Sequence, residues 1–222
     1  MHSDSVVLDR SNVQQFIDRA VQLHKTNNLR EAETIYRQIL ELEPDQPVVL
    51  HLLGVVAHQS GNSEAAVRLI KQAVALVPSY AEAFNSLGAS YKNLGHFKEA
   101  VSSYRRAISV KPDFADAYFN LGNTLQALDQ HEDAVESYQK AISIRPNHAE
   151  SHNNLGNSYQ SLNQLNKAED SYKNAITLDS SNASAHHNLG VALGDQGKLD
   201  EAISSYQLAA SFDPDNAEIK NN

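Results

Sequence analysis

The sequence contains no cysteine, no tryptophan and only one methionine. Without cysteine the chain cannot form a disulfide, a thiolate zinc site or a cysteine nucleophile. Basic residues are also scarce, since 18 Lys and Arg stand against 27 Asp and Glu and give a net charge of −9. Nucleic-acid binding needs concentrated Lys and Arg, so we expect no nucleic-acid partner.

Long apolar runs are missing as well. No segment approaches the roughly 20 apolar residues that a membrane-spanning helix requires, and the mean hydropathy is −0.47. The first residues, from Met1 to Ser5, lack the basic and apolar regions of a signal peptide. The sequence therefore predicts a cytoplasmic protein with no membrane partner.

What the sequence does contain is a period of 34 residues, which four residue types follow in one register. The series are Gly54, Gly88, Gly122, Gly156, Gly190; Ala32, Ala66, Ala100, Ala134, Ala168, Ala202; Tyr36, Tyr104, Tyr138, Tyr172, Tyr206; and Pro44, Pro78, Pro112, Pro146, Pro214. The period divides residues 13–216 into six units, at 13–46, 47–80, 81–114, 115–148, 149–182 and 183–216. Residues 1–12 remain as an N-terminal tail and helix cap, and residues 217–222 begin an unfinished seventh unit.

Each unit predicts two amphipathic helices and no strand. In the third unit Phe84, Leu87 and Gly88 share one helical face, and Tyr104 belongs to a second helix after the break at Gly95. Glycine inside a helix costs about 1 kcal/mol relative to alanine. Its recurrence therefore indicates that two helices approach closely there, with a tyrosine filling the adjacent gap.

These residues resemble the tetratricopeptide repeat family, whose 34-residue signature has Leu-Gly, Ala, Tyr, Ala and Pro at these spacings. The resemblance implies an all-α, right-handed superhelical solenoid of six helix–turn–helix repeats, with the first helices lining a concave groove. The phrases Phe119–Asn123 and Asn153–Asn157 also resemble the repeat arm of O-linked N-acetylglucosamine transferases. The catalytic domain of those enzymes is not in this chain, so none of their catalytic residues can be carried over.

In this family, positions 2, 5, 6, 9, 12 and 13 of each unit face or border the groove. The candidate peptide-binding residues at these positions are Asn85, Asn120, Asn123, Asn153, Asn154, Asn157, Asn188, Glu82, Asp116, Glu150 and His51. A carboxamide both donates and accepts, so a row of asparagines suits the main chain of an extended peptide. The alternative is that Asn120, Asn154 and Asn188 bond to neighbouring loops and hold adjacent units together, and the two roles can coexist.

The acidic residues at position 2 favour a peptide with Lys or Arg. A second explanation is that Glu82, Asp116 and Glu150 lie in the first turn of a helix, where each carboxylate offsets the helix dipole by about 0.3–1 kcal/mol. Pairs such as Glu169–Lys173 are expected to be solvated contacts of little significance.

Sites for metals, cofactors and catalysis are not predicted. His152 and His186 share position 4 of successive units, where we expect core imidazoles with one polar atom satisfied. Nucleophile-elbow, zinc-protease and dinucleotide motifs are all missing, so this chain is not expected to be an enzyme.

The two ends of the array carry separate predictions. Ser11 followed by Gln14 suits a capping box at the first helix. In the second unit the apolar Val48, Leu52 and Val55 predict a pocket or contact surface, with core packing as the alternative for Leu52. At the other end the unfinished unit has no polar capping helix, which leaves self-association through this end open.

The leading hypothesis is therefore a protein–protein interaction scaffold that binds an extended peptide in its concave groove. The alternative is a substrate-recruiting arm of a larger glycosyltransferase. Both would use the same groove.

Overall fold

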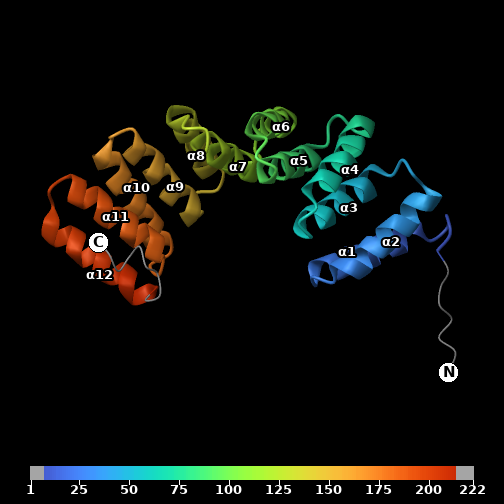
Figure 1. Cartoon of the computed structure of the whole chain (residues 1–222), viewed down its shortest axis with the longest axis horizontal. Helices are drawn as coiled ribbons and strands as arrows, with labels where there is room; N and C mark the ends of the chain where they lie inside the picture. Colours follow the sequence, from blue (N-terminus) through green and yellow to red (C-terminus); the bar gives the residue numbers. More distant parts are fainter. Residues whose placement is uncertain (1–7, 214–222) are drawn as a thin grey trace, which may run out of the picture. The chain divides into compact units, whose positions relative to one another are not determined.

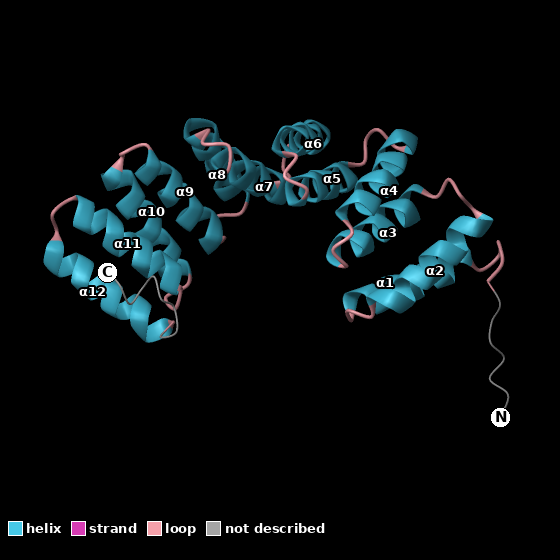
Figure 2. Cartoon of the chain, viewed as in Figure 1, coloured by secondary structure: helices cyan, strands magenta, loops and turns pink. Residues whose placement is uncertain are grey.

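The computed structural model describes residues 8–213, and within that range it contains α-helices and no strand (Figure 1, Figure 2). The helices are α1 (Val13–Lys25), α2 (Leu29–Leu42), α3 (Pro47–Gln59), α4 (Ser63–Leu76), α5 (Ala81–Asn93), α6 (Phe97–Val110), α7 (Ala115–Gln126), α8 (His131–Ile144), α9 (Ala149–Ser161), α10 (Leu165–Leu178), α11 (Ala183–Asp195) and α12 (Leu199–Phe212). The predicted all-α class is confirmed. Pro214 and the start of the proposed seventh unit lie outside the described residues.

The chain forms two compact units, and the first ends at Lys111 where the second begins at Pro112. Each unit contains three helix pairs, α1–α6 in one and α7–α12 in the other. Within each unit every helix packs against the next one in sequence, which is the stacking of a helical solenoid. None of the helices between residues 8 and 213 is both long and apolar enough to cross a bilayer.

The turn inside each helix pair uses the same backbone conformation in all six repeats. Residues 27, 61, 95, 129, 163 and 197 all have φ between +56° and +83°. Three of them are glycines, and Asn27, Asp129 and Asn163 occupy the other three turns. Asparagine and aspartate are the non-glycine residues that tolerate the left-handed region best. The turn therefore recurs every 34 residues although its residue type does not.

The helical glycines lie where the two helices of a pair touch. A Cβ atom added at Gly122 would lie 2.7 Å from the Tyr138 ring, and one at Gly156 would lie 2.5 Å from the Tyr172 ring. Gly54 meets Ile70 in the same way, in the one repeat whose tyrosine is replaced. The predicted fit of a small residue against a large one is confirmed, and these glycines are required for space and not for backbone freedom.

The start of α1 differs from the predicted capping box. The helix begins at Val13, and Asn12 is its N-cap residue, without a capping bond from its side chain to the helix. Ser11 Oγ donates to Asp9 Oδ1 at 2.5 Å, and Gln14 Nε2 donates to Asp18 Oδ1 at 2.9 Å. The capping-box prediction is therefore wrong, because the aspartates at both sides bind the two side chains that were expected to pair.

The second repeat keeps part of its predicted apolar surface. Leu52 packs against the core formed by α1, α2 and α3, as its core-packing alternative predicts. Val55 is half-buried, and Val48 is 44% exposed at the start of α3. Only Val48 of the three offers a largely open apolar side chain.

Candidate functional site

The candidate asparagines of the second compact unit, which begins at Pro112, lie on the first helix of each of its repeats. Asn120 and Asn123 lie on α7, Asn153, Asn154 and Asn157 on α9, and Asn188 on α11. Their positions 5, 6 and 9 are i, i+1 and i+4 of a helix and share one face. The 34-residue period repeats that face from one helix pair to the next.

Bonds between neighbouring repeats connect these side chains. Asn154 Nδ2 donates to Asn123 Oδ1 of the preceding repeat at 2.9 Å. Asn188 Nδ2 donates to Asn157 Oδ1 at 3.0 Å and to Asn153 Oδ1 at 3.1 Å. Position 6 of one repeat thus bonds to positions 5 and 9 of the repeat before it. The partners are side chains on the first helices of neighbouring repeats, and not the loops named in the alternative hypothesis.

Buried tyrosines of the same repeat donate hydrogen bonds to the position-9 asparagines. Tyr138 Oη donates to Asn123 Oδ1 at 2.7 Å, and Tyr172 Oη donates to Asn157 Oδ1 at 2.8 Å. Burial raises the pKa of both phenols well above the ordinary value, so both remain protonated donors at neutral pH. Each asparagine Oδ1 therefore accepts two hydrogen bonds, one from its own repeat and one from the next.

This network decides which amide groups remain available. Asn154 is bonded at both ends of its amide, because its Nδ2 donates to Asn123 and its Oδ1 accepts from Asn153 Nδ2 at 3.2 Å. Within the described residues, Nδ2 of Asn123, Nδ2 of Asn157 and Oδ1 of Asn188 make no hydrogen bond. Asn85 and Asn120 also take part in interactions. The free N–H donors therefore belong to position 9, whereas the position-6 row of Asn120, Asn154 and Asn188 contributes only the free acceptor of Asn188.

His51 is the candidate site residue of the second repeat, and it is buried. Its Nδ1 lies 3.0 Å from Tyr80 Oη and its Nε2 lies 2.9 Å from Ser86 Oγ of the next repeat. Burial lowers its pKa to about 4, although the carboxylate of Glu82 acts in the opposite direction. A neutral imidazole donates with one nitrogen and accepts with the other, so His51 links two repeats as the asparagines do.

The acids of position 2 are ion-paired in two repeats. Glu82 lies 3.2 Å from Lys111 Nζ, and Asp116 lies 2.8 Å from Arg145 Nη1. The pKa of Glu82 is lowered, first by its own backbone N–H and then by Lys111. Glu150 is exposed and forms no ion pair among the described residues. These pairs were not predicted from the sequence, although Lys111 and Arg145 both directly precede a proline of the 34-residue series.

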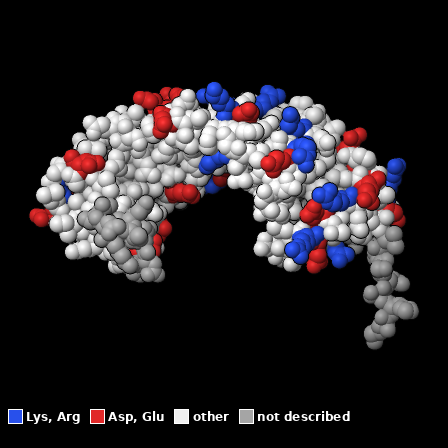
Figure 3. All heavy atoms as spheres, in the orientation of Figure 1, with Lys and Arg blue, Asp and Glu red and all other residues white. Residues whose placement is uncertain are grey.

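Charges of both signs are distributed across the surface. On the face shown in Figure 3, basic and acidic side chains are interspersed over the N-terminal repeats, and the last repeats show few charges. No large patch of a single sign is visible on that face.

Glu169 is a buried carboxylate whose surroundings were not predicted from the sequence. It is 8% exposed and bonds to Lys173 of its own helix, to Lys198 Nζ at 2.7 Å and to Gln196 Nε2 at 3.0 Å. These bonds, that from Lys173 first, lower its pKa to about 2. The expectation of a solvated i,i+4 pair is wrong here, because the turn of the next repeat covers the carboxylate.

The histidines of position 4 bond to loop carbonyls. His186 is buried and its Nε2 donates to the Ser180 carbonyl at 3.0 Å, while the half-buried His152 donates to the Pro146 carbonyl at 3.1 Å. The predicted core imidazole with one satisfied polar atom is confirmed for His186. Residues 8–213 contain no group of three His, Asp or Glu side chains arranged to hold a metal ion.

Sequence comparison identifies the class to which this repeat array belongs. Models described as tetratricopeptide repeat match residues 23–90, 113–181 and 153–217, and one described as TPR repeat matches residues 91–129. Together with the stacked helix pairs, these matches show that the chain belongs to the tetratricopeptide repeat family. No curated protein sequence matches it.

Several solved structures share the fold. The structure titled MamA is 25% identical with a TM-score of 0.70, and the match covers 75% of this chain and 97% of MamA. Pseudomonas aeruginosa pilF is 17% identical with a TM-score of 0.82, covering 95% of this chain and 96% of pilF. YrrB, described as a TPR protein with an unusual peptide-binding site, is 20% identical with a TM-score of 0.72, covering 83% of this chain and 95% of YrrB. The matching family models describe repeats alone, so they give no support to the glycosyltransferase alternative.

Proposed function

We propose that this protein is an interaction scaffold that binds the main chain of an extended peptide along α7, α9 and α11. The observation that carries the proposal is the pair of free amide groups at Nδ2 of Asn123 and Asn157. Each belongs to a side chain whose Oδ1 is fixed by a tyrosine and by an asparagine of the next repeat. A donor held in this way loses little conformational entropy when it binds a peptide carbonyl.

Other features of the same surface fit a peptide ligand. The free Oδ1 of Asn188 can accept from a peptide N–H, so the surface offers both donors and an acceptor. The unpaired carboxylate of Glu150 lies on α9 and favours a Lys or Arg in the peptide. YrrB has the same fold and a described peptide-binding site, so the fold is compatible with this use. We place the protein in the cytoplasm and assign no catalytic step to this chain.

Changing Asn123 and Asn157 to aspartate should weaken peptide binding about 5- to 150-fold, which corresponds to two hydrogen bonds of about 0.5–1.5 kcal/mol each. Aspartate keeps the oxygen that accepts from the tyrosine and from the next asparagine but removes the free N–H. The ligands are uncharged peptides selected from a random twelve-residue display library with the parent protein. Affinity is measured by titration at two salt concentrations, with circular dichroism as the test of folding.

A matched control adds the same two charges elsewhere. Asn163→Asp with Asn174→Asp alters two exposed side chains, and Asp129 occupies the equivalent of position 163 one repeat earlier. This control should bind like the parent. Undiminished binding by the folded Asn123→Asp/Asn157→Asp variant would show that the asparagines only connect repeats.

Self-association through the C-terminal end is a second candidate function. On α12 the side chains of Leu199, Ile203, Leu208 and Phe212 are 65%, 54%, 47% and 46% exposed. Light scattering at increasing protein concentration should then show a dimer that Leu199→Lys with Ile203→Lys converts to a monomer. A parent protein that stays monomeric at high concentration would exclude this candidate.

A further inference from the structure

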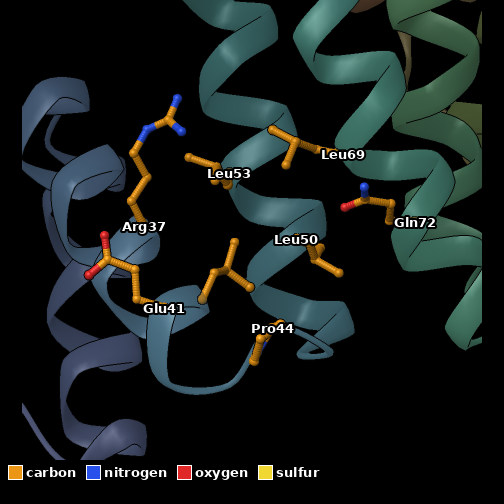
Figure 4. A pocket seen from close by; sticks show the side chains of 8 residues that line it. Arg37, Glu41, Pro44, Leu50, Leu53, Leu69 and Gln72 are labelled. Carbon is orange, nitrogen blue, oxygen red and sulfur yellow. The ribbon is translucent and has the colours of Figure 1, made fainter.

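A cavity of about 360 Å³ opens between α2, α3 and α4 of the first compact unit, which ends at Lys111 (Figure 4). Its apolar walls are Leu40, Leu50, Leu53 and Leu69. This volume is near the lower end of the range for ligand pockets and suits one large side chain. The sequence predicts an apolar pocket or contact surface in this repeat from Val48, Leu52 and Val55, but other residues line this cavity.

The equivalent place in the next repeat is filled by the chain itself. Phe84 takes the position of Leu50, and the guanidinium carbon of Arg106 lies 5.7 Å from the centroid of its ring. Arg106 Nη2 also donates to the Pro78 carbonyl at 3.3 Å. The second repeat has Leu50 and Gln72 at these two positions, so both the ring and the guanidinium are missing.

The fifth and sixth repeats fill the same place with an imidazole that also donates a hydrogen bond. His152 Nε2 donates to the Pro146 carbonyl, and His186 Nε2 donates to the Ser180 carbonyl. The corresponding carbonyl beside the cavity is that of Pro44, which accepts no hydrogen bond from residues 8–213. In the third, fifth and sixth repeats a guanidinium or imidazole N–H donates to the equivalent carbonyl, as no described residue does for Pro44.

The rim of the cavity carries one charge of each sign. Figure 4 shows Arg37 and Glu41 on α2 beside Leu50 and Leu53 of α3, with Pro44 in the turn between the two helices. The Arg37 guanidinium is held by Glu33 at 2.7 Å. Glu41 is exposed and has no ion pair in the described chain, and the other five repeats have alanine, serine or threonine at its position.

We propose that this cavity binds a tryptophan side chain of a partner protein, next to a Lys or Arg of the same partner. The indole ring occupies the space that Phe84, His152 or His186 fills in the third, fifth or sixth repeat, and its N–H donates to the Pro44 carbonyl. Arg37 lies along the ring face as Arg106 does in the next repeat, and Glu41 pairs with the neighbouring base of the partner. The site uses residues of the first unit only and is independent of the asparagines of α7, α9 and α11.

The absence of tryptophan from this chain allows a direct test. The probe is the capped tripeptide Lys-Trp-Lys, whose indole emission is followed while the 222-residue chain is added. Capped Lys-Leu-Lys serves as competitor, and Gly-Trp-Gly tests the charge at the rim. The key variant, Leu50→Phe/Leu69→Ser/Gln72→Arg, copies the residues of the next repeat, namely Phe84, Ser103 and Arg106. Because Phe84 and Arg106 already stack in the protein and Ser103 is buried on the same helix as Arg106, the variant is expected to fold.

Saturable blue-shifted emission with the parent, and at least about tenfold weaker binding to the filled variant, are the expected results. Glu41→Gln, a change of an exposed side chain, should weaken Lys-Trp-Lys more than Gly-Trp-Gly. The proposal is overturned if the parent does not bind Lys-Trp-Lys, if Lys-Leu-Lys competes equally well, or if the folded filled variant binds as the parent does. Should the filled variant fail to fold, an unchanged affinity of Glu41→Gln for Lys-Trp-Lys would overturn it instead.

Discussion

Replacing Tyr172 with alanine should lower the free energy of unfolding by about 3–5 kcal/mol, the range for truncating a large buried aromatic residue. The ring is 0% exposed and fills the space beside Gly156, so its removal leaves a cavity between α9 and α10. The hydroxyl is lost as well, and with it the bonds to Asn157 Oδ1 at 2.8 Å and Gln160 Oε1 at 2.9 Å. Urea denaturation followed by circular dichroism measures the change.

Two further variants separate the ring from the hydroxyl. Tyr172→Phe should cost only about 1–2 kcal/mol, because the ring remains and two acceptors lose a donor. Tyr206→Ala should cost less than Tyr172→Ala, because Tyr206 is only half-buried in the last described repeat. Equal losses for the alanine and phenylalanine variants of Tyr172 would mean that packing against Gly156 contributes little.

Acid should destabilise the protein well above the pH at which carboxylates titrate, and His51 should cause much of the effect. Its pKa is about 4 in the folded chain and about 6.5 when unfolded. Above pH 6.5 the imidazole is neutral in both states. As the pH falls below 6.5 the unfolded chain binds a proton that the folded chain does not, so stability falls by about 1.4 kcal/mol per pH unit. The loss should reach about 3 kcal/mol when the pH approaches 4.

The variant His51→Gln should show a much shallower pH dependence of the denaturation midpoint between pH 7.5 and 4.5. Burial also lowers the pKa of His58, so a smaller slope of the same sign should remain, and His58→Gln is the matched control. Glu169 adds its own acid loss only below about pH 4.5, because its pKa falls from 4.5 to about 2 on folding. An identical slope in the parent and in His51→Gln would refute the assignment to His51.

The sequence alone predicted the repeat, its two helices and the contact between glycine and tyrosine. These features depend on short helical spacings and on a period that the residues repeat visibly. The inner turn was predicted only where it is glycine, as at Gly95. Asp129 and Asn163 adopt the same left-handed backbone, and a search for glycine alone misses them.

The allocation of polar groups was decided by the tertiary structure. The sequence does not show that Asn154 is bonded at both Nδ2 and Oδ1 whereas Asn157 has a free Nδ2. The partners on other helices lie 15 to 35 residues away, and the bonds depend on how each helix is rotated against its neighbours. The burial of His51 and of Glu169 arises in the same way from a following repeat.

The cavity between α2, α3 and α4 also could not be predicted from the sequence. The sequence shows leucine at position 50 where later repeats have a ring, but either a tighter contact or an open space could follow from that change. Only the packing of α2, α3 and α4 leaves the space open, because Leu50 and Gln72 do not form the stacked pair that Phe84 and Arg106 form at the equivalent positions. Local spacing therefore determined the helices and their period, whereas the surfaces available for binding follow from contacts between repeats.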